Sequence, residues 1–386
     1  MCQSATEPAS KANEVTLNRR LGRLVEGLLP PLAALLIAFA VGGVVIGLTV
    51  HSWTAPFQAY WQLLVGAFGS WYDVQESLTG SITLIFAALA VALAFRAGLF
   101  NLGVEGQLYA GAIFSTFIGI SLAWPGYLLL PVCVLASAVA GAIWALIPAL
   151  AKIFRGTHEI VTTFMLNYVA LFLMHYLLAN SGTPGPMAGS IFSGTASPPV
   201  NARFPVIVPG FIASDGQLNL AFALAIAASV AVWFLLFRTT FGYRLRAIGL
   251  NPGGARFAGL GTRRTLLITM LISGALAGMA GSAYVFGVGG QLTDEWDGFA
   301  TGFDAIAVAL LGRNTPQGAF LAAILFGAMD HGGLSLQLHG LADANIIVII
   351  QGLVILFVAC EAAFGLLGRR LGSSLVEGLS PRLEPT

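Results

Sequence analysis

Apolar segments of about the length that crosses a membrane recur along the whole chain. A helix needs roughly 20 consecutive apolar residues to span the hydrocarbon core of a bilayer. Polar or glycine-rich stretches separate the segments and hold most of the charged residues. This pattern predicts ten crossings, at Leu28–Val50, Leu78–Phe95, Gln107–Trp124, Tyr127–Leu150, Ile160–Ala179, Leu218–Phe237, Leu266–Phe286, Phe303–Leu311, Ala319–Leu336 and Ala344–Leu367.

Two of these segments differ from the rest. Phe303–Leu311 is too short to cross a bilayer unaided, so it either is re-entrant or extends back toward Phe299. Leu28–Val50 lacks the short apolar core and the cleavage pattern of a signal peptide, so we expect it to remain as a helix. The predicted fold is an all-α polytopic membrane protein with about ten transmembrane helices, some of them broken or re-entrant.

Composition supports a membrane protein and argues against other classes. Hydrophobic residues make up 57% of the 386 residues and charged residues make up 9%, whereas soluble domains carry about 25% charged residues. The formal net charge of +1 argues against a basic surface for a nucleic acid. The three cysteines are widely separated and form no metal-binding pattern.

Lysine and arginine gather in alternate connections, which indicates the orientation of the chain. Cytoplasmic loops carry an excess of these residues, and here they precede Leu28–Val50, follow Tyr127–Leu150 and Leu218–Phe237, and end the chain. Both termini are therefore expected in the cytoplasm. The chain then divides into a polar tail at 1–25, a transmembrane domain at 26–368 with an extracytoplasmic loop at 180–217 and a cytoplasmic loop at 238–264, and a cytoplasmic tail at 369–386.

The cytoplasmic loop has the pattern of two short helices. The run "GYRLRAIG", Gly242 to Gly249, favours one helix. Asn251 can cap a second helix, and Pro252 suits its first position. Two such helices would form a rigid protrusion for a partner protein, but an ordinary basic loop would satisfy the positive-inside rule equally well.

A polar cluster interrupts an apolar part of the chain at Phe95–Ala112, which carries Arg96, Asn101, Glu105 and Gln107. A carboxylate in hydrocarbon costs several kcal/mol unless it is paired or hydrated. Glu105 would therefore pair with Arg96, accept from backbone N–H groups at a helix start, or line a solute pathway or its gate. The sequence leaves these roles open.

A second polar group lies in Gly156–Ala170, where Thr163 and Asn167 are four residues apart on one helix face. Such side chains commonly hydrogen-bond neighbouring helices, so a structural role and a pathway role both fit. Together with the first cluster and two residues of the short segment, they give the candidate pathway residues. These are Asn101, Glu105, Gln107, Thr163, Asn167, Tyr168, Phe303 and Asp304.

No catalytic motif is visible in the sequence. It contains no phosphate-binding loop, no His-Glu-x-x-His motif and no Gly-x-Ser-x-Gly motif. The run "DHGG" at Asp330–Gly333 places an acid beside an imidazole, but adjacent residues on a helix point in different directions. We therefore expect a non-catalytic chain without a metal site, so that any hydrolysis of ATP belongs to another subunit.

Four motifs, in this order, resemble the membrane permeases of bacterial ABC importers. The resemblance is to the branch that serves simple sugars and branched-chain amino acids, and most closely to its nucleoside-type permeases. It extends over most of the chain, from about Leu28 to Gly368. The motifs are "GLFNLGVEGQ" at Gly98–Gln107, "GTHEIVTTFMLNYVA" at Gly156–Ala170, "GYRLRAIGLNPGGARFAGL" at Gly242–Leu260 and "GFDAIAVALLGRNTPQGAFLAAILFG" at Gly302–Gly327.

The resemblance implies a complex in the bacterial plasma membrane. Two permease chains, identical or similar, would share a central pathway, and ATPase subunits carrying ATP and Mg²⁺ would dock beneath them. An extracytoplasmic binding protein, often lipid-anchored, would deliver the solute, and this chain itself would hold no cofactor. The loop at 238–264 would seat in the ATPase through Arg244, Arg246, Gly249, Asn251, Pro252, Arg256 and Gly259.

The implied function is import of nucleosides by alternating access, driven by the separate ATPase. A simple sugar such as a pentose is the alternative solute within the same class. A remoter alternative is an ion-coupled secondary transporter, in which Glu105 and Asp304 would be the membrane-buried ion or proton sites.

Overall fold

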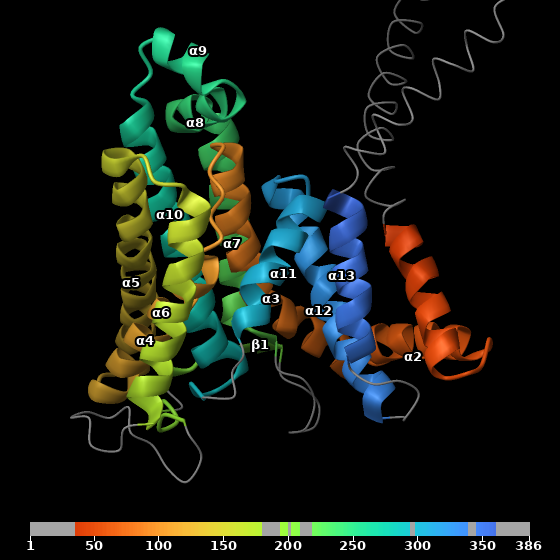
Figure 1. The fold of residues 1–386 in the computed structure, drawn as a ribbon. Helices are drawn as coiled ribbons and strands as arrows, with labels where there is room; N and C mark the ends of the chain where they lie inside the picture. The colour runs from red at the N-terminus through yellow and green to blue at the C-terminus, as the bar shows by residue number, and fades with distance from the viewer. Residues whose placement is uncertain are drawn as a thin grey trace, which may run out of the picture. The chain divides into compact units, whose positions relative to one another are not determined.

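A computed structural model describes residues 35–179, 194–199, 202–208, 218–293, 298–338 and 345–359, and nearly all of them are helical (Figure 1). A helix at Leu35–Thr49 comes first. The strands β1 (Val206–Val208) and β2 (Leu218–Asn219) form one antiparallel pair. The further helices are α2 (Ala55–Phe68), α3 (Trp71–Arg96), α4 (Val104–Ser121), α5 (Gly126–Arg155), α6 (Glu159–Ala179), α7 (Leu220–Arg238), α8 (Thr240–Leu250), α9 (Pro252–Phe257), α10 (Thr262–Ala283), the π-helix η2 (Tyr284–Val288), α11 (Gly298–Leu311), α12 (Pro316–Leu338) and α13 (Asn345–Ala359).

Each of the ten predicted crossings overlaps a described helix. Six helices, namely α3, α5, α6, α7, α10 with η2, and α12, are long and apolar enough to span a bilayer. Three shorter apolar helices lie at Leu35–Thr49, Thr301–Leu311 and Ile346–Phe357 within the described residues. The predicted helical membrane fold is therefore confirmed in outline, while the count of ten crossings and the cytoplasmic termini stay predictions.

The short segment near Phe303 belongs to a longer helix than its apolar run indicates. Its helix, α11, begins at Gly298, so the segment extends back past Phe299, which was one of the two alternatives. The chain forms two compact units, Met1–Pro56 with Val348–Thr386, and Phe57–Ile347. The second unit holds α3 to α12 in full.

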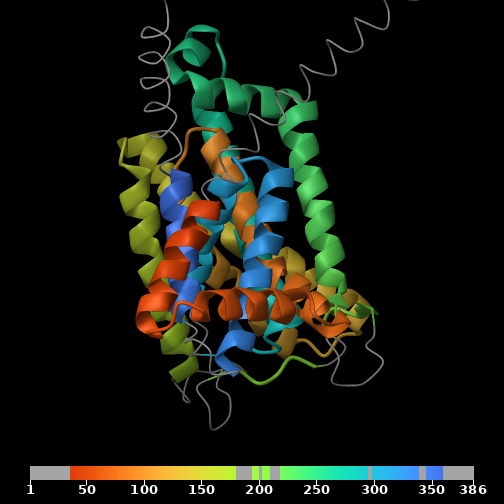
Figure 2. The same ribbon diagram turned by 90° about the vertical axis from the view of Figure 1, so that its right-hand side faces the viewer.

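Helix α3 forms the centre of the larger unit. Its residues Ser81–Ala94 are buried without interruption. A helix that is apolar on all faces is stable only when neighbours surround it, and α3 packs against α7, α10, α11 and α12 (Figures 1 and 2). Its position sets the packing of the other helices in this unit.

Helices α5 and α10 approach each other closely through small residues. A Cβ on Gly278 would lie 2.9 Å from the carbonyl carbon of Ser137 and 3.1 Å from Cα of Gly141. The hydroxyl oxygens of Ser137 and Ser282 are 2.9 Å apart at the same contact. Lipid gives helices no hydrophobic reason to associate, so close backbone packing of this kind provides much of the attraction.

One end of the larger unit is basic, and we name it the α8 end because α8 and α9 lie there (Figures 1 and 2). Helices α3, α5 and α7 finish at that end with Arg96, with Lys152 and Arg155, and with Arg238. The strands lie at the opposite end, which we name the β1 end. Basic residues of the described helices are thus segregated as the sequence predicts.

Replacing Gly278 by alanine should destabilise the fold, because the added methyl group would overlap Ser137 and Gly141. Overpacking a tight contact costs about 1–3 kcal/mol, so thermal unfolding of the detergent-solubilised protein should shift to lower temperature. Gly80 is the matched control, since a Cβ there would meet no atom within 4 Å. Equal unfolding temperatures for Gly278→Ala and Gly80→Ala would contradict the close packing of α5 on α10.

Candidate functional site

The break between α3 and α4, residues 97–103, is held by a network of buried polar groups. Asn101 donates to Oε1 of Gln107 at 3.0 Å and to Oγ of Ser273 at 2.9 Å. Its side-chain oxygen accepts from Nε2 of Gln107 at 3.0 Å and from the backbone N–H of Gly103 at 3.1 Å. The hydroxyl of Ser273 donates in turn to the carbonyl oxygen of Ala90 at 2.8 Å. Asn101 therefore joins the break to α4 and, through α10, to α3.

Asn167 of α6 supports the first turn of α4. Its side-chain oxygen accepts from the backbone N–H of Gly106 at 2.9 Å, and its amide donates to the carbonyl oxygen of Leu102 at 2.8 Å. The first N–H groups of a helix have no intrahelical partner, and Asn167 satisfies one of them. Thr163, one turn earlier, is buried and donates to the carbonyl oxygen of Glu159 at 2.7 Å. Both side chains thus have structural bonds, and their pathway role stays a prediction.

Glu105 is fully buried and lies against α11. A Cβ on Gly302 would lie 2.6 Å from Cβ of Glu105 and 2.9 Å from its Oε2, so a larger residue would not fit there. Arg96, a partner that the sequence offered, donates instead to the backbone carbonyls of Arg313 and Asn314. The role of Glu105, structural or in the pathway, stays a prediction.

Phe303 and Tyr168 both pack against the ring of Phe164 of α6. The ring of Phe164 is edge-on to both, with centroid distances of 5.4 Å to Tyr168 and 6.2 Å to Phe303. Phe303 is 37% exposed, so part of its ring is accessible. Asp304 follows Phe303 in α11 and is partly buried. The structure therefore brings Asn167 of α6 into contact with α4, and Phe164 of α6 into contact with Phe303 of α11.

The loop between α7 and α10 folds into two short helices, as its sequence predicts. Thr239 caps α8, and Asn251 caps α9 by accepting from the backbone N–H of Gly254 at 2.9 Å. Pro252 occupies the first turn of α9, where its missing N–H costs nothing. Gly259 has a φ of +73°, a conformation that glycine adopts without strain. These local signals make the protrusion a defined structure.

The tip of this protrusion is both apolar and basic. Leu250 is 89% exposed and Phe257 is 96% exposed. Arg244 of α8 and Arg256 of α9 are exposed as well. Large exposed apolar side chains next to charged ones are typical of surfaces that bind another protein.

Arg246 has a different environment from the other arginines of the protrusion. Its guanidinium carbon lies 5.1 Å from the ring centroid of Phe237, and its Nε donates weakly to the carbonyl oxygen of Gly242 at 3.4 Å. A guanidinium over an aromatic face is held by a cation–π attraction. Arg246 therefore contributes to the folding of α8 on α7, in addition to any contact with a partner.

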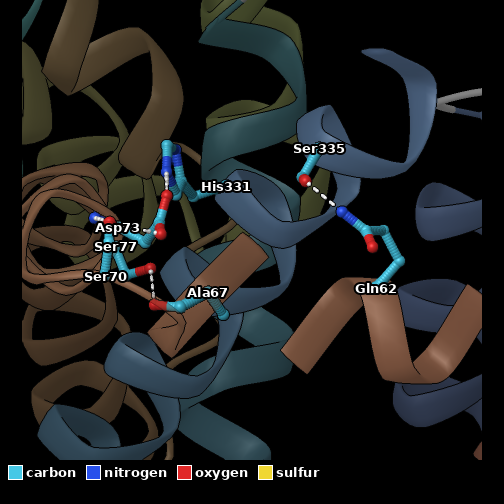
Figure 3. A network of polar contacts seen from close by, with 7 residues as sticks. All are labelled: Gln62, Ala67, Ser70, Asp73, Ser77, His331 and Ser335. Atoms are coloured by element: carbon cyan, nitrogen blue, oxygen red, sulfur yellow. Dashed lines mark hydrogen bonds and ion pairs between the residues drawn. The ribbon is translucent and has the colours of Figure 1, made fainter. Parts of the chain in front are cut away.

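A second polar cluster, at the β1 end, was not predicted from the sequence. Figure 3 shows His331 of α12 directed at Asp73 of α3, with Nε2 and Oδ1 3.4 Å apart. In the same view Gln62 of α2 donates to Oγ of Ser335 at 3.1 Å. The sequence places His331 beside Asp330, yet the partner that it faces is Asp73.

Only half of this cluster has a sequence signal. Ser70 and Asp73 fit the Ser-x-x-acid pattern of a helix start. The structure confirms it, because the N–H of Asp73 donates to Oγ of Ser70 at 3.2 Å and the Ser70 hydroxyl donates to the Asp73 carboxylate at 2.5 Å. His331 lies 258 residues from Asp73, and Ser335 lies 273 residues from Gln62, so no local pattern connects either pair.

Most of the chain matches one protein family and several known permeases. Residues 74–359 match the family described as "Branched-chain amino acid transport system / permease component". The guanosine ABC transporter permease protein NupP of Bacillus subtilis is 35% identical over 336 residues, which are 87% of this chain and 94% of NupP. The nucleoside ABC transporter permease protein NupB of Lactococcus lactis is 32% identical over 334 residues, 86% of this chain and 91% of NupB.

A similar protein with another solute is the glucose ABC transporter permease protein TsgB13 of Haloferax volcanii. It is 36% identical over 347 residues, which cover 86% of this chain and 87% of TsgB13. No solved structure matches the chain. The family match spans α3 to α13, and the chain is therefore a multi-pass membrane protein that belongs to the permease family of branched-chain amino acid transport systems.

Proposed function

We propose that this chain is the permease subunit of an ATP-driven importer of nucleosides. The observation that carries the proposal is its similarity, over nearly its full length, to a guanosine permease and to a nucleoside permease. Both relatives are permeases of ABC transporters, in which a separate subunit hydrolyses ATP. The similar glucose permease favours a simple sugar as the second candidate solute within the same class.

In the proposed complex the α8 end faces the cytoplasm, because basic residues concentrate on that side of a membrane. ATPase subunits would bind ATP and Mg²⁺ and receive α8 and α9. A second permease chain, identical or similar, would complete the pathway, and an extracytoplasmic binding protein would present the solute at the β1 end. This chain would contribute no cofactor.

The protrusion is suited to transmit movement of the ATPase into the membrane. Helix α8 begins two residues after the end of α7, and α10 begins soon after α9. Arg246 of α8 lies over Phe237 of α7, and only short connections join α7 to α8 and α9 to α10, so a shift of the two short helices would pull on α7 and α10. Their displacement would re-expose the pathway from one side of the membrane to the other.

The proposed pathway follows the face where α4, α6 and α11 meet. Phe303 and Tyr168 offer aromatic faces, on which the flat base of a nucleoside can stack. The buried amides of Asn101, Gln107 and Asn167 hold the wall behind them in place. Specificity would rest chiefly with the binding protein, so that the permease releases the solute readily.

The binding protein of this importer should bind nucleosides and should bind pentoses or glucose far more weakly. Titration calorimetry with guanosine, adenosine, ribose and glucose measures this directly. Exclusive sugar binding would overturn the nucleoside assignment and leave the sugar alternative. Uptake that survives loss of the ATPase but collapses with the proton gradient would instead contradict the whole importer proposal.

Arg256→Glu should abolish association with the ATPase, because it reverses a charge at the exposed tip of the protrusion. Central charged contacts of an interface commonly contribute about 2 kcal/mol or more. Co-purification of the ATPase with the tagged permease measures the effect. Arg203→Glu is the control, since Arg203 is exposed but lies near β1. Normal assembly of the Arg256 variant would count against the protrusion as the docking site.

Asn167→Ala and Phe303→Ala should have different effects, because Asn167 supports the fold and Phe303 contributes to the proposed pathway. Loss of Asn167 leaves two backbone groups without their partner, which costs about 1–3 kcal/mol and should lower the unfolding temperature. Phe303 is partly exposed, so its truncation should preserve stability and slow uptake. If Asn167→Ala unfolds like the unmodified protein while uptake falls, Asn167 belongs to the pathway instead.

A further inference from the structure

The end of α8 packs directly on the last turn of α3. Gly249 has no room for a side chain, because a Cβ there would overlap the carbonyl oxygen of Arg96 and lie 3.1 Å from the carbonyl carbon of Ala97. On the other side of the contact, Gly98 has a φ of +72°, and its Cβ would lie 3.4 Å from Cα of Gly249. Since backbone meets backbone, no flexible side chain can absorb a shift of α8.

Arg96 extends this contact to the turn between α11 and α12. Its Nε donates to the carbonyl oxygen of Asn314 at 2.8 Å, and its Nη2 donates to that of Arg313 at 3.3 Å. A guanidinium is planar and presents its donors in a fixed fork, so it holds two neighbouring carbonyls in one orientation. The segments that it joins are more than two hundred residues apart in the sequence.

The turn that Arg96 holds has an unfavourable backbone conformation. Arg313 and Asn314 have φ angles of 53° and 52°, in the left-handed region, which asparagine tolerates but arginine seldom adopts. Two such residues in succession persist only where their surroundings impose them. The N–H of Asn314 donates to the carbonyl oxygen of Ala309 at 2.7 Å, and Arg96 fixes the two carbonyls. The turn therefore keeps its conformation through these contacts, and displacement of Arg96 would remove part of that support.

Helix α11 leads from this turn to the proposed pathway. Gly302 lies on the side chain of Glu105, and Phe303 lies on the ring of Phe164. A helix transmits displacement along its axis because its backbone hydrogen bonds hold successive turns together. A shift of the α11–α12 turn would therefore reach Gly302 and Phe303.

We propose that Arg96 is a positioning residue that couples α8 to α11. It receives displacement of α8 through the Gly249 contact and passes it to the carbonyls of Arg313 and Asn314, and so to the pathway face of α11. The inference rests on the proposed function, because it requires an ATPase that moves α8. A planar double donor is needed, so lysine would replace it in part and glutamine would not.

The experiment uses the intact complex of permease, ATPase and binding protein, reconstituted in proteoliposomes. The measured quantity is solute imported per ATP hydrolysed. Arg96→Gln should co-purify with the ATPase and hydrolyse ATP, yet this ratio should fall by about tenfold or more, since two charge-assisted hydrogen bonds are lost. Arg96→Lys should give an intermediate ratio. Arg155→Gln, at an exposed arginine that ends α5 at the same end of the unit, should leave it unchanged.

Two results would overturn the proposal. One is a normal ratio in both Arg96 variants, and the other is an equal loss of import and hydrolysis, which is the result of a purely structural role. Should Arg96→Gln fail to assemble, Arg96→Lys decides alone, because it retains the charge: a normal ratio overturns the proposal and a reduced one supports it. An unmodified complex that imports nothing with ATP contradicts the proposed function, so the two failures are distinguishable.

Discussion

Inside a bilayer no water reaches a backbone N–H or C=O group, so each such group must find its partner within the protein. The break between α3 and α4 meets this requirement through two asparagines. Asn101 bonds the break to α4 and α10, while Asn167 bonds both the break and the first turn of α4. The contact of α10 with α4 and the place of α11 over Glu105 depend on α4 beginning where these side chains hold it.

The wall of the proposed pathway combines a hydrogen-bonded side with an aromatic side. Hydrogen bonds weaken steeply when their geometry changes, so the amides of Asn101 and Asn167 favour one fixed register. The rings of Phe164 and Phe303 meet edge-on, and such contacts tolerate sliding better because dispersion has little directionality. This division suits a subunit in which α4 keeps its place while α11 moves.

Sequence patterns predicted the features that depend on neighbouring residues. The apolar runs marked the helices, and Asn251 with Pro252 marked the start of α9, because both signals act within a few residues. The contacts of Arg96 with Asn314 and of His331 with Asp73 join segments more than two hundred residues apart, and no local pattern encodes them. For Glu105 the sequence showed that a carboxylate buried in a membrane must be paired or hydrated. Which neighbour it faces depends on how α11 packs.

The exposed tip of the protrusion also affects how the chain behaves before it joins a complex. Phe257 and Leu250 are almost fully uncovered in the single chain, and exposed apolar side chains are sites of non-specific association. If the proposed ATPase covers this tip, chain made in excess of the ATPase would leave these residues open to chaperones and proteases. Under the proposed function, the exposure of Leu250 and Phe257 therefore favours synthesis of the subunits in matched amounts.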